Sequence, residues 1–440
     1  MGSTFKKYYN KMADEKLSPL VIETFLRYYE KVQAGDRGLL TKSEIVPPAK
    51  ENVISFNTLT NKEVTNLSKL SVIKLNGGLG TTMGLTKAKS LLPVKNELNF
   101  LDLIALQTLR LRETTGQNVP LILMNSFNTD TDTLGYLKKY PTLEIAGLPL
   151  SFIQNKFPKV RRDNLQPFEY ESDPTQEWNP PGHGDIYIAL TVFGILDKLI
   201  DSGIEYAFIA NSDNLGATVD PRILNYLIES NTPFLMEVCN RLEIDKKGGH
   251  LAQDKAGQLL LREVAQCPEN EVDEFQNIEL YRYFNTNNIW VNLKAVKELM
   301  ETENNLFLLP LILNPKVVDG TEVYQIETAM GAAISKFPNS KALVVPRERF
   351  APVKKTSDLL TIWSDAYVID DNYRITLHPS CPAPPYVELD DKYYKTIDQI
   401  KKRFPFGAPS LVNCRSLKVE GDHTFDKDFI CSGDVTIDAD

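Results

Sequence analysis

The residues best suited to chemistry in this chain stand in short polar segments that follow apolar runs, and the clearest segment is rich in glycine. LNGGLGTTMG covers residues 75–84. Glycines such as Gly77 and Gly78 let the backbone adopt positive φ angles and approach a ligand closely, with N–H groups directed at phosphate oxygens. Lys89 follows and offers a cation to the same phosphates. The spacing matches neither the dinucleotide fingerprint nor a Walker loop, so we expect a different phosphate-binding turn.

A histidine flanked by glycines forms the second polar segment. PPGHGDIY, residues 180–187, places His183 between Gly182 and Gly184. The two glycines would expose the imidazole and the neighbouring amides in a tight turn. Most single histidines are structural or solvated, and the local pattern supports ligand contact and that plainer explanation about equally.

The third segment, ANSDNLGA at residues 210–217, follows another apolar run and contains Asp213. A carboxylate at the carboxyl end of a strand is a hard oxygen ligand of the kind that Mg²⁺ uses when it bridges substrate phosphates. Asp213 and Asn214 are also typical of an Asx turn, which is the better explanation of the segment taken alone.

Two more segments suit substrate recognition only in combination with the others. FNTNNIW, residues 284–290, puts asparagines beside a predicted strand, and amide side chains both donate and accept, as sugar hydroxyls and base edges require. FAPVKKTSDLL, residues 350–360, puts Lys354 and Lys355 before a predicted helix. A polar turn and a pair of solvated lysines are the plain alternatives. The sequence has no GxSxG or HExxH motif, so the serine hydrolase and zinc protease classes find no support.

Strands and helices in alternation must position these segments. The apolar runs at residues 70–76, 120–126 and 206–214 predict strands, and the patterns from Phe100 to Arg112 and from Ile186 to Asp201 each predict a helix. Such alternation with short connections predicts a mainly parallel sheet covered by helices. Ligands bind such sheets at the carboxyl ends of the strands, where the polar segments stand.

The two ends of the chain differ from this pattern. Residues 18–35 predict an amphipathic helix with cap residues at both ends, which favours a packing role. The proline-rich stretch 379–409 resembles a connection between domains. Beyond it, EGDHTFD at 420–426 returns as SGDVTID at 432–438, a spacing of twelve residues that suggests coils of a β-solenoid. The pattern stops at Asp440 without a capping element, as in a shortened C-terminus.

Composition narrows the classes of protein. The chain has 440 residues, 49 Lys and Arg against 58 Asp and Glu, and a net charge of −9. Its length suggests roughly two to three domains. An acidic chain disfavours general binding to nucleic acid or to anionic membranes, so an anionic substrate must meet a local cluster of cations or N–H groups. The hydrophobic content of 42% is that of a folded globular protein.

Cysteines and apolar runs bear on the compartment. The five cysteines are scattered without a CxxC pair, and only four histidines occur, which argues against a disulfide framework and a zinc or His-rich metal centre. No apolar run approaches the ~20 residues of a spanning helix, and the first residues contain no signal-peptide core. We therefore expect a soluble, cytoplasmic protein.

The polar segments are more specific together than singly. From about Leu70 to the end of the chain, their series resembles eukaryotic-type UTP–glucose-1-phosphate uridylyltransferases, also called UDP-glucose pyrophosphorylases. In order, the series is LNGGLGTTMG with Lys89, LMNSFNT (123–129), WNPPGHGDIY, ANSDNLGA, KGGHL (247–251), FNTNNIW, IETAMGAA (326–333) and PVKKTSDLL.

The resemblance implies an α/β nucleotide-diphospho-sugar transferase fold of glycosyltransferase-A type, with a Rossmann-like mixed sheet and a C-terminal left-handed β-helix. It divides the chain into an N-terminal helical lobe (1–65), a nucleotidyltransferase domain (66–378), and a linker with the β-helix (379–440). It also implies the reversible reaction of UTP and glucose 1-phosphate to UDP-glucose and pyrophosphate, with Mg²⁺. The sugar phosphate would attack the α-phosphorus in line, and the β-helix would carry any homo-oligomer contacts.

The resemblance further assigns roles to residues of this sequence. Those expected against the uridine and its phosphates are Gly77, Gly78, Met124, Gln154 and Gly182. Those expected at the sugar, its phosphate or the ribose are His183, Asn211, Glu263, Asn285 and Asn287. The lysines expected to bind the phosphates and stabilise the reacting charge are Lys89 and Lys354. Asp213 would hold Mg²⁺.

Three positions depart from the family pattern, namely Ala88, Asn179 and Ala351, where proline, an aromatic residue and leucine are usual. They flank the expected site and bear on rate or affinity. One alternative within the enzyme class is a broader UDP-sugar or UDP-N-acetylhexosamine pyrophosphorylase. Another class is a non-catalytic nucleotide-sugar-binding subunit, which we rank lower because Lys89, Asp213 and Lys354 are all present. A purely structural solenoid ranks lowest, because the repeat covers only the tail.

Overall fold

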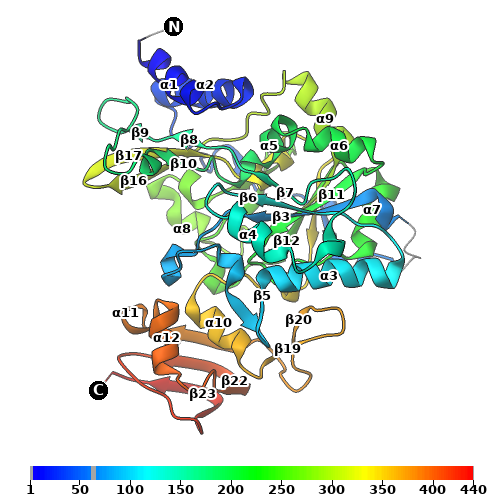
Figure 1. The fold of residues 1–440 in the computed structure, drawn as a ribbon, viewed down its shortest axis with the longest axis vertical. Coiled ribbons are helices and arrows are strands. Elements are labelled where there is room, and N and C mark those ends of the chain that lie inside the picture. Colours follow the sequence, from blue (N-terminus) through cyan, green and yellow to red (C-terminus); the bar gives the residue numbers. More distant parts are fainter. Residues whose placement is uncertain (1–2, 61–65, 440) are drawn as a thin grey trace. The chain divides into compact units, whose positions relative to one another are not determined.

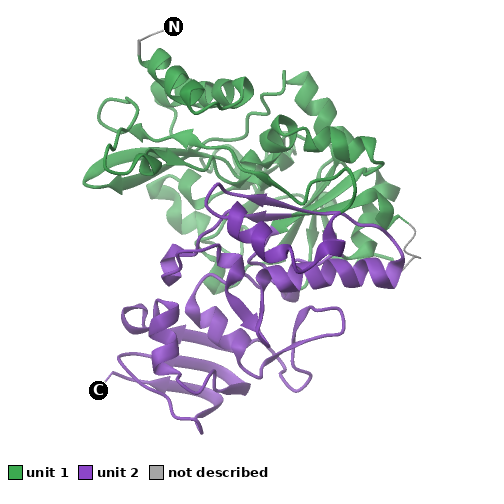
Figure 2. Cartoon of the chain, viewed as in Figure 1, with its two compact units in different colours: residues 1–73, 145–210, 220–346 green, residues 74–144, 211–219, 347–440 purple. Residues whose placement is uncertain are grey.

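Figure 1 shows the chain as a computed structural model, which describes residues 3–60 and 66–439. It divides into two compact units, coloured separately in Figure 2. Unit 1 comprises residues 1–73, 145–210 and 220–346, and unit 2 comprises residues 74–144, 211–219 and 347–440. The three-domain division expected from the sequence stays a prediction, and residues 61–65 at its first boundary lie outside the described residues.

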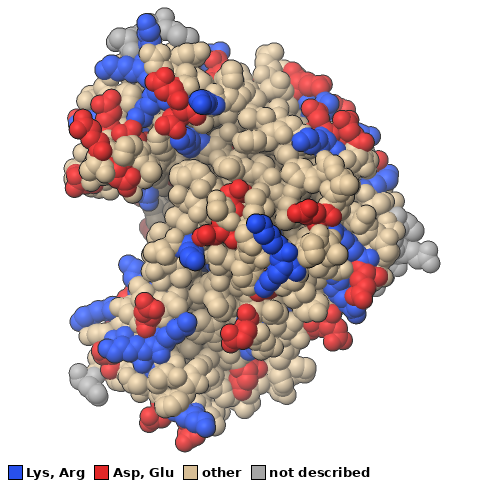
Figure 3. Space-filling view, in the orientation of Figure 1, with Lys and Arg blue, Asp and Glu red and all other residues tan. Residues whose placement is uncertain are grey.

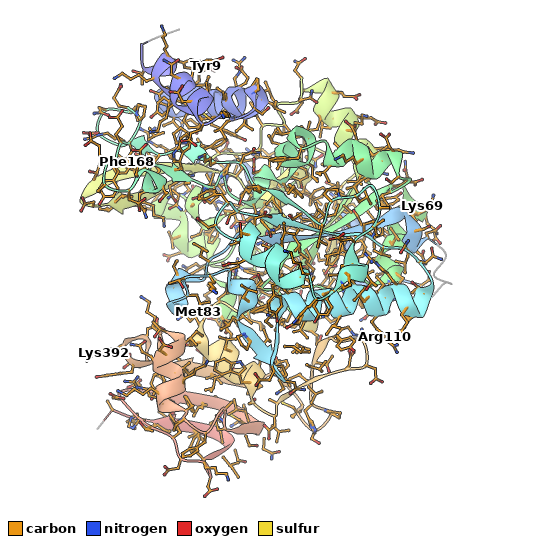
Figure 4. All side chains as sticks on the ribbon, viewed as in Figure 1. Tyr9, Lys69, Met83, Arg110, Phe168 and Lys392 are labelled. Carbon is orange, nitrogen blue, oxygen red and sulfur yellow. The ribbon has the colours of Figure 1, made fainter. Side chains whose placement is uncertain are left out.

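Unit 1 begins with two helices, α1 (Ser3–Asp14) and α2 (Pro19–Gln33), which pack against each other. The predicted helix is confirmed: the Ser18 hydroxyl accepts from the N–H of Leu20 at 3.3 Å, and a proline occupies the first turn. Tyr8 is buried, whereas Tyr9 beside it on α1 is 45% exposed (Figure 4). Burial of one face fixes these helices as packing elements.

A mixed sheet forms the centre of unit 1. Its strands lie in the order β2 (Val53–Ser55), β18 (Lys341–Val344), β12 (Phe234–Asn240), β15 (Tyr283–Asn292), β11 (Tyr206–Asn211) and β3 (Leu70–Asn76). β2, β18 and β12 pair in parallel, but β15 runs antiparallel to both β12 and β11. The expectation of a mainly parallel sheet is therefore wrong, because strand direction leaves no mark on a buried apolar run. The mixed α/β sheet implied by the resemblance is confirmed.

Smaller strands and further helices complete unit 1. Three antiparallel strands branch from β15 within the same sheet, namely β1 (Ile45–Val46), β13 (His250–Asp254) and β14 (Leu259–Arg262). The remaining strands are β7 (Ser151–Ile153), β8 (Phe157–Pro158), β9 (Val160–Arg161), β10 (Trp178–Asn179), β16 (Ile312–Val318) and β17 (Thr321–Glu327). The helices are α5 (Ile186–Val192), α6 (Ile195–Asp201), α7 (Pro221–Ser230), α8 (Val272–Phe275) and α9 (Leu293–Thr302).

One helix prediction needs correction. The segment Ile186–Asp201, expected as one helix, forms two helices, α5 and α6. Between them Gly194 takes a φ of +64°, a left-handed conformation that ends one helix and lets the next start in a new direction. The two helices and α9 pack next to one another (Figure 1).

Unit 2 contains strands and helices that the sequence predicts well. The predicted helix is α3 (Phe100–Thr115), and its start is a capping box in which Asn99 and Asp102 exchange backbone-to-side-chain hydrogen bonds of 2.8 and 3.0 Å. The other elements before residue 380 are α4 (Asp130–Leu137), α10 (Thr356–Trp363), β4 (Pro93–Lys95), β5 (Leu98–Asn99), β6 (Leu121–Asn125), β19 (Tyr367–Ile369) and β20 (Ile375–Leu377).

The C-terminal part of unit 2 is a small parallel sheet. Its strands lie in the order β21 (Tyr386–Leu389), β22 (Ser410–Val419) and β23 (Ile430–Ile437), with α11 (Asp391–Tyr394) and α12 (Ile397–Arg403) beside them (Figure 1). Val419 pairs with Ile437, eighteen residues on. The twelve-residue repeat is therefore not the structural period: its first copy follows β22 as irregular chain, and its second lies mostly within β23.

The surface carries charges of both signs. Figure 3 shows Lys and Arg interspersed with Asp and Glu over the visible face. This agrees with a modest net charge and leaves the attraction of an anionic ligand to local clusters. Among the described residues, no helix is long and apolar enough to cross a bilayer.

Candidate active site

The glycine-rich turn in unit 2 begins at the end of β3 and is closed by hydrogen bonds. The N–H of Lys89 donates to the carbonyl of Gly78 at 2.9 Å. Gly80 takes a φ of +65°, and a Cβ there would come within 2.8 Å of the Leu85 side chain, so glycine is required. A Cβ on Gly78, in contrast, would meet nothing within 4 Å. The turn thus leaves open backbone at Gly78, as close approach of a ligand needs.

The turn brings Lys89 to a charged group that we call the lysine–aspartate cluster, formed by Lys89, Asp213 and Lys354. The Lys89 ammonium donates to Asp213 Oδ2 at 2.6 Å and also to the carbonyl of Val353. The Lys354 ammonium lies 3.7 Å from the same Oδ2, on a side chain that is 60% exposed. Three predicted site residues from distant parts of the sequence are therefore in one place. Two cations that share one carboxylate leave a net positive charge, which suits a phosphate.

Asn214 holds the cluster's two loops together. Its Oδ1 accepts from the N–H of Gly216 at 3.1 Å, the Asx turn considered from the sequence, and also from the N–H of Ala351 at 2.9 Å. The N–H of Val353 donates to the carbonyl of Asp213 at 3.0 Å. The two interpretations of this segment are therefore compatible: Asn214 makes the turn, and Asp213 directs its carboxylate to the lysines.

Asp213 is also the residue best placed to hold a cation. Its Oδ1 is buried and makes no hydrogen bond to a described residue, whereas Oδ2 carries both lysine contacts. An unpaired carboxylate oxygen fits Mg²⁺, which is commonly held by one or two carboxylates together with substrate phosphates. Within residues 3–60 and 66–439, no group of three His, Cys, Asp or Glu forms a complete protein cage for a metal.

Met124, Gly77 and Asn211 lie at or just beyond the ends of β6, β3 and β11 respectively. Met124 is in β6 and is 2% exposed. The Ser126 hydroxyl, just beyond that strand, donates to the carbonyl of Gly77 at 3.0 Å, so the first glycine is fixed against the end of β6. Asn211 ends β11, and its carbonyl accepts from the N–H of Asn214 at 3.3 Å.

In unit 1, the His183 turn is fixed by a neighbouring backbone segment. A Cβ on Gly182, whose φ is +76°, would come within 2.3 Å of the Thr328 carbonyl. The N–H of Met330 donates to His183 Nδ1 at 2.9 Å. Because a backbone N–H can only donate, Nδ1 is the acceptor, and in the neutral ring the proton is on Nε2. His183 can therefore present a donor from Nε2.

Gln154 adjoins the same turn. Its Nε2 donates to the carbonyl of Gly182 at 2.7 Å. The next residue, Asn155, donates from its backbone N–H and its side-chain amide to the Asp185 carboxylate at 2.8 and 2.9 Å. Burial raises the pKa of Asp185 to about 6. Sequence reasoning did not identify Asp185 or Asn155, since nothing in the sequence pairs residues thirty apart.

The remaining predicted residues of unit 1 form what we call the asparagine network, namely Glu263, Asn285 and Asn287. Asn285 Nδ2 donates to Asn287 Oδ1 at 2.9 Å, and the N–H of Asn287 donates back to Asn285 Oδ1 at 2.9 Å. Asn287 takes a φ of +57° within a bulge of β15. Burial raises the pKa of Glu263 to about 7, and its hydrogen bond with Asn285 partly opposes that rise.

Two glycines make room for this network. A Cβ on Gly249, in the KGGHL segment, would come within 2.5 Å of Glu263 Oε2, and a Cβ on Gly331 would lie 3.2 Å from Asn285 Nδ2. Gly331 follows Met330, which holds His183. The 328–331 segment therefore contacts both the His183 turn and the asparagine network.

The three departures from the family pattern occupy structural positions. Asn179 is 1% exposed and donates from Nδ2 to the carbonyl of Pro180 at 2.9 Å. Ala351 contributes the N–H that Asn214 accepts. Ala88 is buried immediately before Lys89.

Comparison with known proteins finds one family that matches most of the chain. Residues 22–432 match the family described as UTP–glucose-1-phosphate uridylyltransferase. A curated relative of that name from Musa acuminata is 43% identical over 423 residues, which cover 94% of this chain and 89% of the relative. Another from Saccharomyces cerevisiae is 42% identical over 421 residues, covering 94% and 82%.

Solved structures are similar over the whole chain. The open and closed structures of UDP-glucose pyrophosphorylase from Leishmania major match with a TM-score of 0.93 and 42% identity, covering 100% of this chain and 95% of that one. A variant of the Leishmania protein in complex with UDP-glucose matches with a TM-score of 0.94 and 42% identity, at the same coverage. A Trypanosoma brucei structure matches with a TM-score of 0.91 and 45% identity, covering 99% and 95%.

Proposed function

The chain belongs to the UTP–glucose-1-phosphate uridylyltransferase family, and we propose that it converts UTP and glucose 1-phosphate reversibly into UDP-glucose and pyrophosphate. The main support for the proposal at the level of residues is the lysine–aspartate cluster. In it, Lys89 and Lys354 share Asp213 Oδ2, while Oδ1 makes no hydrogen bond. The adjoining glycine-rich turn supplies open backbone N–H groups. This combination suits a polyphosphate.

The chemistry asks little of the protein beyond position and charge. An oxygen of the sugar phosphate forms a bond to the α-phosphorus of UTP while the bond to the bridging oxygen breaks, and pyrophosphate leaves with that oxygen. Lys89 binds the β- and γ-phosphates and neutralises the leaving group. Lys354 stabilises the charge that builds at the α-phosphorus. Aligning the two anions is the larger part of such catalysis.

Mg²⁺, held through Asp213, would neutralise phosphate charge and orient the triphosphate. The Lys89 ammonium now on Oδ2 is free to follow the phosphates, since a lysine side chain can rotate about four bonds. Support for the metal comes from the unpaired, buried Oδ1.

Other predicted residues would recognise the organic parts of the substrates. We propose that Met124, Gln154 and Gly182 each have a role in contacting the uracil, and that Asn211 lies near the ribose or sugar. His183 would donate from Nε2 to the sugar-phosphate region. Glu263, Asn285 and Asn287 would read the glucose hydroxyls. The Leishmania variant solved in complex with UDP-glucose supports the nucleotide sugar as a ligand.

For the rest of the chain, we propose that residues 379–440 form a linker and a short left-handed β-helix, the surface through which any homo-oligomer would assemble. The parallel pairing of β21, β22 and β23 supports stacked coils. Residues 1–65 would form a helical lobe and residues 66–378 the catalytic domain. We also propose a cytoplasmic location, which the scattered cysteines, with no CxxC pair among them, support.

The test is pyrophosphate release by the purified chain with UTP, glucose 1-phosphate and Mg²⁺. Comparators are GTP, galactose 1-phosphate and N-acetylglucosamine 1-phosphate. Release confined to UTP with glucose 1-phosphate supports the proposal, and release with several sugars supports the broader pyrophosphorylase. If no pair releases pyrophosphate although UDP-glucose binds in calorimetry, the chain is a non-catalytic binding subunit and not an enzyme.

A further inference from the structure

Asp185, a buried carboxylate that the proposed chemistry does not use, is part of the His183 turn. Asp185 is 4% exposed, and both of its oxygens accept from one residue, Asn155. The backbone N–H and the side-chain Nδ2 of Asn155 are both donors. Each oxygen of Asp185 must therefore act as an acceptor if both bonds are to form. At pH 8 the carboxylate is ionised, because its pKa is about 6, and it can accept both bonds.

This pairing fixes the residue next to Asn155. Gln154 donates from Nε2 to the carbonyl of Gly182 at 2.7 Å, and Gly182 lies three residues before Asp185. A carbonyl oxygen cannot donate, so the amide nitrogen of Gln154 must face it. The amide is therefore held in one of its two orientations. Its Oε1, which no described residue hydrogen-bonds, is left as an acceptor.

The fixed orientation distinguishes two pyrimidines. Uracil carries a hydrogen on N3 between two carbonyl groups, whereas cytosine has a bare N3 beside an amino group. An Oε1 that cannot exchange places with Nε2 pairs with the N3–H of uracil and is repelled by the N3 lone pair of cytosine. An amide free to rotate would accommodate either base.

We propose that Asp185 is a positioning residue which, through Asn155, holds the Gln154 amide in the orientation that selects uracil over cytosine. The inference rests on the proposed function, in that Gln154 must meet the base. Asp185 itself touches no substrate. It acts at a distance by setting the backbone from which Gln154 extends.

The test compares kcat/KM for UTP and CTP at pH 8 in wild-type protein and in three variants. In Asp185→Ala, neither the backbone N–H nor the side-chain Nδ2 of Asn155 has its acceptor, so the pairing is lost. In Asn155→Ala, only the backbone bond to Asp185 remains. The double variant Asn155→Asp with Asp185→Asn exchanges the carboxylate and the amide and restores two complementary hydrogen bonds.

We expect Asp185→Ala to narrow the UTP-to-CTP ratio of kcat/KM about tenfold, chiefly through a higher KM for UTP. Asn155→Ala should narrow it less, and the double variant should keep most of the wild-type ratio. Equal losses with both nucleotides, or a narrowed ratio in the double variant, would overturn the proposal. If Asp185→Ala fails to fold, the ratios of Asn155→Ala and the double variant decide in the same way.

A matched control separates position from stability. Asp102 in α3 is a buried carboxylate, 1% exposed, that accepts from Tyr136 and Tyr140 at 2.7 Å each. Asp102→Ala should lower the unfolding temperature but leave the UTP-to-CTP ratio unchanged, and a narrowed ratio there would count against a specific role for Asp185. Wild-type protein that releases no pyrophosphate would instead contradict the proposed function. Failure of the proposed function is thus distinguishable from failure of the proposed role of Asp185.

Discussion

The lysine–aspartate cluster of unit 2 and the asparagine network of unit 1 hold their side chains in opposite ways. The first relies on full charges on long side chains, one of which, Lys354, is 60% exposed. The second relies on amides bonded to one another within a backbone bulge. The attraction between two charges persists over several ångströms, whereas a hydrogen bond is lost when its donor and acceptor move apart by about one ångström. The comparison predicts that the proposed phosphate binding tolerates motion, and that the proposed sugar recognition requires rigidity.

The largest effect should come from removing charge from the first region. Lys354→Ala is expected to lower kcat by about 10²- to 10³-fold with the fold intact, because the ammonium meets charge that develops in the transition state. Asp213→Ala should cost a similar amount. Steady-state kinetics and a melting curve of each purified variant measure this.

Lys355 provides the control for that substitution. It is adjacent in sequence and 65% exposed, but its ammonium lies 3.4 Å from Asp391 instead of at the cluster. Lys355→Ala should retain kcat within about twofold. Equal losses at positions 354 and 355 would mean that the local backbone, and not the Lys354 charge, governs turnover.

A second pair of variants compares Gly182, where a Cβ would clash with neighbouring backbone, with Gly78, where a Cβ would meet nothing within 4 Å. Gly182→Ala should destabilise the fold by about 2–4 kcal/mol, since it combines a positive φ with a Cβ 2.3 Å from the Thr328 carbonyl. Gly78→Ala should leave the unfolding free energy within about 1 kcal/mol yet weaken UTP binding, because only a ligand would meet its methyl group. Chemical denaturation and calorimetric titration with UTP separate the two effects. A large loss of stability in Gly78→Ala would contradict the open turn.

The smallest effect should be a pH-dependent change in stability at Glu263. Its pKa is about 7 in the folded chain against 4.5 ordinarily, so between these values the folded state holds a proton that the unfolded state has lost. Stability therefore falls as pH rises from about 4.5 to 7. Glu263→Gln cannot titrate, and its unfolding temperature relative to wild type should rise by a few degrees between pH 5 and pH 8.

Exposed Glu243 supplies the comparison, with a side chain that is 73% exposed. The same substitution there should change the unfolding free energy by less than about 0.5 kcal/mol. A difference between Glu263→Gln and wild type that stays constant from pH 5 to pH 8 would show that burial does not perturb the Glu263 carboxyl group, and the asparagine network would then be more open to water than the structure indicates.

Local patterns predicted the elements better than their arrangement. The helix from Pro19, the start of α3 at Asn99, and the strand that precedes Asp213 follow from capping and periodicity. The break at Gly194 also had a signal, because a glycine within a helical pattern costs about 1 kcal/mol, but the apolar period continued through it.

What could not be predicted depends on residues far apart in the sequence. The antiparallel insertion of β15 between β12 and β11 has no local signature, because buried strands read alike in either direction. Asp185 was overlooked for a related reason: its partner Asn155 belongs to another segment, and only the fold brings their donors and acceptors together. The C-terminal repeat shows the converse error, because two segments of similar sequence, 420–426 and 432–438, adopt different structures.

The bulge in β15 bears on how proteins of this kind can change over evolutionary time. Glu237 pairs with Asn288 and Val238 with Asn285, so β15 carries two extra residues between them. An even insertion keeps side chains on the same faces of the sheet, whereas an odd one would turn the core outward. Ile289, Trp290 and Val291 thus stay buried beside a segment that can gain or lose a pair of residues. A lineage could therefore alter the asparagine network by such steps without rebuilding its hydrophobic core.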